Sequence, residues 1–431
     1  MPATDSVSVF TEGTFSEQIR ELVVYLARGH PEEERASYIQ PFQDVLTVAD
    51  NEKPIEEDED RQRKVLTMVV SEVKGLGDGT DKEIEGFFNL LFSHFLTVLP
   101  LDAPETKVHL IALLQAISST PDQTLTKYRI LSNIFNAIPG QSALRLLVYK
   151  TLIEIASASD ELEHLTLERA KVEKWLQEWD VSQQEKSDFL KSIADAFAKC
   201  QELGTSYEYT LSYVNSLPPS SPSAHAAAVD AIATALRLPS LFDFDPLFRL
   251  DAVVSAKDHE LFSLLQIFLN EGLPEYHAWS ASHANAFAQY GLDKEQLERK
   301  IKLLSLTTLG FQNIGHDLPY ASIASTLQVE PSQVERWVID VIRAGLVSGR
   351  LSQTTQTLHI TRAAARAFER PQWELLEKRL GLWKTSIAEV LEVVAAARKN
   401  NTTEAVGAAG ASAAPNGTET PVIPAKTAAA A

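Results

Sequence analysis

Apolar residues recur at helical spacing along most of the chain. The first such set, all on one helical face, is Phe15, Ile19, Leu22, Val23 and Leu26. The same period returns over residues 81–98, 105–118, 124–137, 142–157, 166–178 and 182–203, with short connectors such as DAPE, STPD and IPGQ. Because no such helix buries its apolar face alone, the pattern over 14–295 predicts a mainly α protein with an α-solenoid of helical repeats. No fixed repeat length emerges.

Two polar stretches interrupt this pattern. NEKPIEEDEDRQRK (51–64) is highly charged but lacks the turn glycines of a calcium loop, so it is interpreted as a solvated connector running into a helix. LPPSSPS (217–223) carries the prolines and serines of a turn between repeats. Both stretches are therefore predicted to be connections rather than binding sites.

The pattern changes over residues 297–362. LERKIKLLSLTTLGF, LPYASIASTL and VEPSQVERWVIDVIRAGL each predict a helix, and LVSGRL and QTLHITR predict two strands joined by SQTT. Three helices and a hairpin make a winged helix. The apolar face of its third helix consists of Val334, Trp337, Val338, Val341, Ile342 and Leu346. Ser332 with Glu335 fits a capping box at the start of this helix, and Gly345 suits a left-handed cap at its end.

A long helix is predicted over residues 371–398, with Pro371 in its first turn. Its apolar residues alternate at spacings of three and four, as in a heptad stripe: Trp373, Leu376, Leu380, Trp383, Ile387, Val390 and Val394. Residues 399–431 are rich in Ala, Thr, Gly and Pro and hold almost no large apolar side chains. Such a composition predicts a disordered tail.

Charge narrows the choice of partner. The chain has a formal net charge of −19 and a pI of about 5.0, so it is repelled by phosphate backbones and anionic membranes unless a basic patch intervenes. The single cysteine, Cys200, cannot form an internal disulfide, which favours a reducing compartment. No signal peptide or membrane-spanning run is evident in the sequence. We therefore expect a cytoplasmic protein that binds other proteins and no membrane.

Catalytic chemistry is not indicated. The sequence contains no P-loop, no H-E-x-x-H and no G-x-S-x-G. His277 and His283 stand six residues apart, on different faces of a helix, and make poor joint metal ligands. We therefore expect no catalytic residues, no cofactor and no metal site, and the only alternative left open is a catalytic pair assembled from distant helices.

The whole arrangement resembles the PCI domain, which is shared by the proteasome lid, the signalosome and translation initiation factor 3. Residues 126–156 resemble a segment typical of the subunit M family of eukaryotic translation initiation factor 3, through Arg129, Leu131, Asn133, Phe135, Asn136, Arg145, Val148 and Tyr149. FERPQWELLEKRLGLWKTSIAEVLEVV (368–394) is similar to the C-terminal helix of that family.

The resemblance gives the expected domains in chain order. These are a flexible N-terminus (1–13), helical repeats (14–205), the helical part of a PCI domain (206–296), its winged helix (297–365), a C-terminal bundle helix (366–398) and a disordered tail (399–431).

The resemblance also implies a function. It implies a non-catalytic scaffold subunit that supports preinitiation complex assembly on the small ribosomal subunit and recruitment of mRNA. Its partners would be the other PCI subunits of the factor, with the small ribosomal subunit contacted indirectly or weakly. Two alternatives remain: a subunit of the signalosome or proteasome lid, and a winged helix that binds RNA through Arg336, Arg343, Arg350 and Arg362. Against RNA, Glu335 and Asp340 lie among these arginines, so autonomous nucleic-acid binding is not expected.

Two surfaces are predicted to bind neighbouring subunits. The first is the wing edge, which we expect to extend a neighbour's sheet by β-augmentation, through Val347, Ser348, Gly349, Arg350, Leu351, Leu358, His359 and Ile360. The alternative is a wing exposed to water. The second is the heptad stripe from Trp373 to Val394, whose distal half is expected to join a helical bundle, while part of it packs back on the winged helix.

Overall fold

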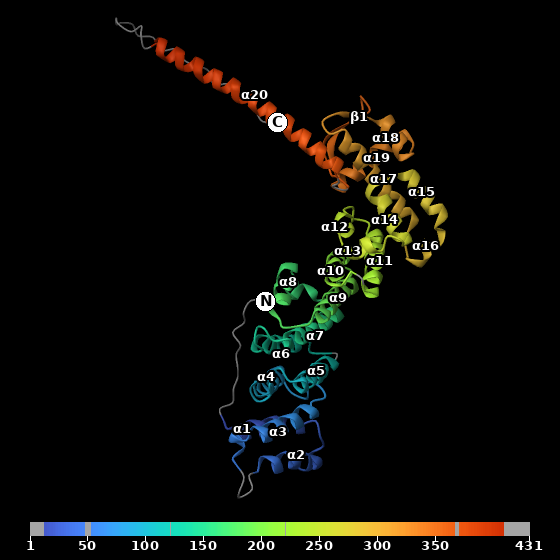
Figure 1. Ribbon diagram of the computed structural model, residues 1–431. Helices are drawn as coiled ribbons and strands as arrows, with labels where there is room; N and C mark the ends of the chain where they lie inside the picture. The colour runs from blue at the N-terminus through green and yellow to red at the C-terminus, as the bar shows by residue number, and fades with distance from the viewer. Residues whose placement is uncertain (1–12, 48–52, 121, 220, 367–369, 409–431) are drawn as a thin grey trace. The chain divides into compact units, whose positions relative to one another are not determined.

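The computed structural model describes residues 13–47, 53–120, 122–219, 221–366 and 370–408 (Figure 1). The chain divides after Arg366 into two compact units. Residues 1–12 and 409–431, which hold most of the predicted flexible N-terminus and disordered tail, lie outside the described residues.

The first unit is built mainly of helices. Those that precede the winged helix are α1 (Phe15–Ala27), α2 (Glu32–Leu46), α3 (Glu59–Glu72), α4 (Asp81–Val98), α5 (Pro104–Ser119), α6 (Thr124–Ala137), α7 (Leu144–Ser159), α8 (Arg169–Glu178), α9 (Gln183–Lys199), α10 (Leu203–Ser216), α11 (Pro222–Arg237), α12 (Asp245–Phe248), α13 (Asp251–Ser255), α14 (Glu260–Asn270), α15 (Leu273–Ser282) and α16 (Ala284–Gln289). Short 3₁₀ turns occur at Ile55–Glu57 and Leu162–His164.

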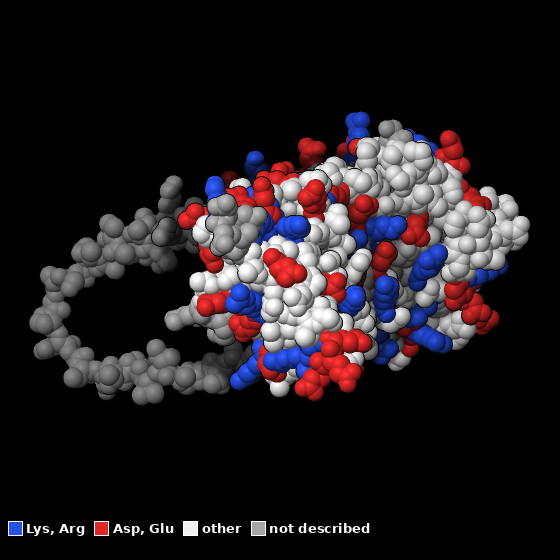
Figure 2. All heavy atoms as spheres, turned by 90° about the horizontal axis from the view of Figure 1, so that it is seen from below, with Lys and Arg blue, Asp and Glu red and all other residues white. Residues whose placement is uncertain are grey.

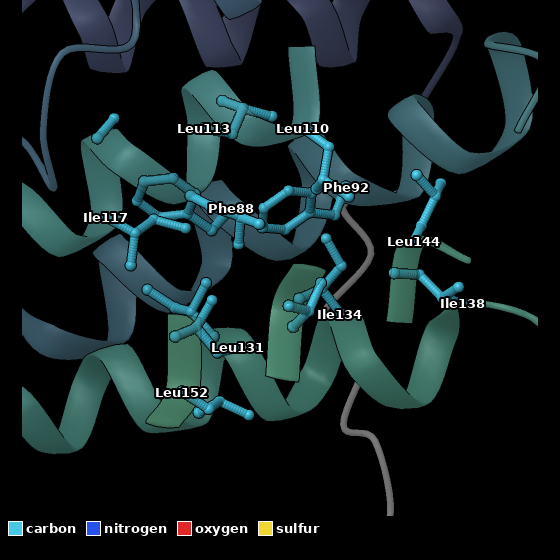
Figure 3. Close-up of a cluster of buried hydrophobic side chains, with 14 of the residues drawn as sticks. Phe88, Phe92, Leu110, Leu113, Ile117, Leu131, Ile134, Ile138, Leu144 and Leu152 are labelled. Atoms are coloured by element: carbon cyan, nitrogen blue, oxygen red, sulfur yellow. The ribbon is translucent and has the colours of Figure 1, made fainter. Parts of the chain in front are cut away.

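These helices stack in chain order. α6 packs on α7 and α9 on α10, while α4 packs on α6, α5 on α7 and α7 on α9, so most contacts join a helix to the next one or the next but one. Figure 3 shows the result inside the stack, where Phe88 and Phe92 of α4 meet apolar side chains from α5, α6 and α7. Short connectors keep helices that are close in sequence close in space, so each helix buries its apolar face against neighbours in the stack. The mainly α, solenoid-type fold predicted from the sequence is confirmed.

One core runs through the repeats from Ile19 to Tyr209. The expected boundary at 205/206 therefore falls inside α10 rather than between bodies. The helix predicted over 182–203 is α9, which ends four residues earlier than predicted, because Gln201 adopts a left-handed φ of 63°. α10 then turns back and packs along α9. Nothing in the local composition distinguishes this turn, since glutamine rarely takes a positive φ.

The residues of the 126–156 segment hold neighbouring repeats together. The Asn133 side-chain amide on α6 donates to Glu85 (3.2 Å) and Asn89 (3.1 Å) on α4. Arg145 lies 4.7 Å from the centre of the Phe135 ring and donates to the carbonyl of Ile138 at 2.9 Å. These residues bridge helices across the stack.

The winged helix closes the first unit. It consists of α17 (Lys294–Gln312), β1 (Asp317–Pro319), α18 (Tyr320–Leu327), a 3₁₀ turn (Pro331–Gln333), α19 (Val334–Arg343), β2 (Val347–Ser352) and β3 (Thr357–Ala363). The sheet is antiparallel with the order β1-β3-β2. β1 was not predicted, because three residues ending in proline give no strand periodicity. The apolar face predicted for α19 is confirmed, with Val334, Val338 and Val341 fully buried.

Lys300 joins the winged helix to the repeats. It lies on α17, is only 2% exposed, and its ammonium donates to the carbonyls of Ala235 (2.8 Å) and Leu238 (2.7 Å) at the end of α11. The ring of Phe244 lies 4.8 Å from the ammonium. Carbonyls at a helix C-terminus have no partner in their own helix, so the lysine satisfies them from a neighbouring element.

Burial lowers the pKa of Lys300 to about 7. Between pH 7 and 9 the unfolded chain keeps this proton and the folded chain loses it, so stability rises with pH in that window. The neutral amine still donates to both carbonyls. We expect the free energy of unfolding to increase by about 2 kcal/mol from pH 7 to pH 9 through this group. Denaturant titrations should show that Lys300→Met lacks this increase, whereas Lys294→Met, at an exposed position of the same helix, keeps it. Equal pH slopes in the wild type and Lys300→Met would contradict the assignment.

The second unit contains helix α20 (Arg370–Ala408). It begins within one residue of the predicted start but continues ten residues beyond the predicted end at 398. Lengthening an existing helix requires no new nucleation, and residues 399–408 include two alanines, a lysine and a glutamate that favour helix. The composition that predicted disorder from 399 on was therefore misleading for this stretch.

Candidate interaction surfaces

The wing edge is formed by β2 alone. Because β3 lies between β1 and β2, its backbone is paired on both sides, and Leu358 and Ile360 are fully buried. Leu358, His359 and Ile360 thus cannot extend a neighbour's sheet, and their assignment to the edge was wrong. His359 instead binds Asp317 of β1 across the sheet at 2.8 Å. The five predicted edge residues on β2, from Val347 to Leu351, do lie at the border of the three-stranded sheet.

The direction of each β2 amide follows from the register. The Ile360 backbone is used toward β1, since its N–H donates to His316 (3.4 Å) and its carbonyl accepts from Gly315 (2.8 Å). Antiparallel strands alternate, so His359 points its backbone toward β2, where it faces Arg350. The Arg350 amide therefore points inward, and the amides of Gly349 and Leu351 point outward from the sheet.

Gly349 is required by close packing within the hairpin. A Cβ at this position would lie 2.4 Å from the carbonyl oxygen of His359. The register shifts beside it, between Ser348 and Gly349, where the Thr361 hydroxyl donates to the Ser348 carbonyl at 2.9 Å. The irregularity increases the local twist of the edge strand, which shortens the straight stretch available for pairing.

The two ends of α19 differ from each other in how well they follow the prediction. The capping box of Ser332 and Glu335 does not form, because Pro331–Gln333 is a 3₁₀ turn and the Glu335 carboxylate accepts from the Gln353 amide at 2.8 Å. Gly345 adopts a φ of 72°, as predicted for the left-handed end. A partner from the distant hairpin thus replaces the local cap.

The outer face of α19 carries mixed charge. Arg336, Ile339 and Arg343 are exposed along it, and Asp340 pairs with Arg299 of α17 at 3.0 Å. Figure 2 shows the same mixture on another face of the molecule, where lysine and arginine alternate with aspartate and glutamate. α19 does not carry a continuous row of basic side chains that would bind the phosphates of a nucleic acid. Ile339 is the one aliphatic residue of the helix that lies off its predicted apolar face.

Arg366 fixes the last residues of the first unit to the end of α14. Its guanidinium donates to the carbonyls of Ile267 (3.1 Å), Phe268 (2.5 and 3.1 Å) and Glu271 (2.8 Å), and to the Thr308 hydroxyl (3.3 Å). Burial lowers its pKa to about 10, so it stays charged at neutral pH. The sequence did not single out this arginine, because its partners lie 58 to 99 residues away.

The apolar stripe of α20 is exposed over its distal half. Trp383 is 67% exposed, Val390 59% and Val394 52%. Leu382 and Val393 are also exposed, and at about 100° per residue they lie on a face roughly 100° from the stripe. The apolar surface is thus wider than a two-stranded coiled coil requires and suits a bundle of several helices.

Metal and membrane sites are not found in the part of the chain that the structure describes. No three His, Cys, Asp or Glu side chains in it gather as metal ligands. Within those same residues, no helix has the length and apolarity needed to span a bilayer.

Two family models match the regions that carry these surfaces. One is described as "eIF3 subunit M, C-terminal helix" and matches residues 366–394. The other is the PCI domain, which matches residues 280–362. The first match begins at Arg366 and covers the whole stripe, from Trp373 to Val394.

Curated proteins named "Eukaryotic translation initiation factor 3 subunit M" are similar over most of the chain. One from Aspergillus terreus is 32% identical over 415 residues, which is 93% of this chain and 89% of that protein. One from Phaeosphaeria nodorum is 31% identical over 356 residues, covering 79% and 80%. One from Dictyostelium discoideum is 29% identical over 326 residues, covering 73% and 79%.

Proposed function

The chain belongs to the family of subunit M of eukaryotic translation initiation factor 3, and from this premise we propose that it is a non-catalytic scaffold subunit of that factor. It supports assembly of the preinitiation complex on the small ribosomal subunit and recruitment of mRNA, with the ribosome contacted weakly or through other subunits. The site of action is the cytoplasm. A role in the signalosome or proteasome lid is not favoured, since the relatives carry the initiation factor's name.

The observation that carries the proposal is the exposed distal stripe of α20, within the part of the chain similar to the family's C-terminal helix. Exposed tryptophan, isoleucine and valine residues in one row are costly in water and are typical of an interface. We propose that this half of α20 joins a helical bundle with other subunits. A tagged chain expressed in eukaryotic cells should therefore recover the subunits of the initiation factor, identified by mass spectrometry. Recovery of signalosome or proteasome-lid subunits instead would overturn the proposal.

The second proposed contact is backbone pairing between β2 and the winged-helix sheet of another PCI subunit. The outward amide of Leu351 is its best probe, because proline removes that donor without touching the inward bonds of Arg350 and Ser352. We expect Leu351→Pro to reduce recovery of the neighbouring PCI subunit by about tenfold, since one or two interfacial hydrogen bonds are lost.

Leu351→Ala is the matched control, because it shortens the same half-buried side chain but keeps the amide. It should assemble nearly as well as the wild type, and thermal denaturation should confirm that both variants fold. If the proline and alanine variants recover the neighbour equally, β2 does not pair with another strand.

A further inference from the structure

The outer face of α19 forms the floor of an open groove. Two adjoining hollows of about 770 and 720 Å³ share Arg299, Asp340 and Arg343 in their walls. Ile339, 42% exposed, lines the first hollow, and the half-buried ring of Trp337 also borders it. The groove thus has a small apolar centre within a polar lining, on a helix whose other face is buried in the winged-helix core.

The charged side chains around Ile339 differ in whether they already have a partner. Asp340 is already paired with Arg299, and Glu335 already accepts from Gln353. Arg336 and Arg343 have no ion pair among the described residues. In the first hollow, three arginines face two carboxylates, a net charge of +1 on a chain of net charge −19. The two free guanidinium groups stand on either side of Ile339, about 10 Å apart along the helix.

We propose that the outer face of α19 is a docking site for an acidic, amphipathic helical segment of a partner protein. Carboxylates two helical turns apart on that segment would pair with Arg336 and Arg343, and an aliphatic residue between them would cover Ile339. Arginine is enriched at protein interfaces and among the residues that contribute most to binding there. The apolar centre and the interleaved carboxylates favour a peptide over RNA, which needs stacking rings or an unbroken basic row.

Site-specific crosslinking in the assembled initiation factor tests this site. Ile339→p-benzoylphenylalanine is introduced into the tagged chain, the complex is purified from cells and irradiated, and crosslinked peptides are identified by mass spectrometry. We expect crosslinks to one protein segment with acidic residues about seven apart. Adding Arg336→Glu and Arg343→Glu should reduce the crosslink at least about tenfold, because two interfacial ion pairs become repulsive. Arg362→Glu, an exposed arginine on β3, should leave it unchanged.

Three results would overturn the proposal: no crosslink, crosslinks to RNA, or a crosslink that both sets of arginine variants affect equally. Recovery of the other subunits with the tagged chain is scored separately in the same purification. If the tagged wild-type chain recovers no other subunits, the proposed scaffold function is contradicted. If it recovers them normally but no crosslink forms, only the α19 docking site is contradicted.

Discussion

A chain that ends at Gly381 is expected to fold normally but to recover the other subunits about 100-fold less well than the full chain. The truncation removes Trp383, Ile387, Val390 and Val394, whose contact with a bundle would bury about 300 Å² of apolar surface. At about 25 cal/mol per Å² this is worth about 7.5 kcal/mol, of which about 3 kcal/mol, or about 100-fold in binding, remains after the ordering costs of association. Quantitative mass spectrometry of material purified through an N-terminal tag measures the loss.

The control for this truncation is a chain that ends at Arg398. It keeps the whole stripe and removes the residues predicted to be disordered, so it should assemble like the full chain. The core of the first unit contains no residue beyond Arg366, so thermal unfolding of both truncated chains should match the wild type. A Gly381-terminated chain that still assembles fully would show that the distal half of α20 is not an interface.

Helices were predictable from the sequence because their signals are local. The bounds of α4 and α6 match the predicted stretches 81–98 and 124–137 at both ends. A threonine precedes α4, and the third residue of that helix is a glutamate, which together form a capping box. A proline follows each of the two helices within two residues and ends it. Gly345 was identified for the same reason, as the left-handed position after α19 is a property of a few adjacent residues.

Strand order was not predictable, because pairing is not local. The hairpin was evident in the sequence, but the third strand, β1, is three residues long and lies some forty residues before its partner β3. Its presence moves Leu358, His359 and Ile360 from the edge to the centre and leaves β2 as the free border. It also fixes which β2 amides point outward, so the most informative proline substitution is at Leu351 rather than Arg350.

Buried cations at helix ends were missed for a similar reason. Lys300 and Arg366 stand in ordinary sequence contexts, and each satisfies carbonyls from a helix more than fifty residues away. Helix C-termini leave four carbonyls without partners, and the sequence shows the acceptors without showing which donor reaches them. These two residues tie α17 and the end of the wing to the repeats, so they control how firmly the winged helix is held.

Arg366→Met is expected to lower the free energy of unfolding of the first unit by about 3 kcal/mol. The substitution keeps an unbranched apolar stem but removes donors to three carbonyls at the end of α14 and to the Thr308 hydroxyl. Leaving such acceptors without partners costs about 1 kcal/mol or more each when they are shielded from water. Denaturant titration gives the energy, and hydrogen exchange should show faster opening of the amides near the C-terminal end of α14.

Arg366→Lys separates the geometry of the guanidinium from its charge. A lysine keeps the favourable charge at the helix end. Its ammonium carries three N–H donors on one atom, however, and cannot donate to three carbonyls and a hydroxyl as the five donors of the planar guanidinium do. We expect it to recover only about a third of the lost stability, because the charge–dipole contribution is about 1 kcal/mol. Full recovery by lysine would mean that charge alone matters, and an Arg366→Met chain as stable as the wild type would mean that these hydrogen bonds contribute nothing to holding the wing.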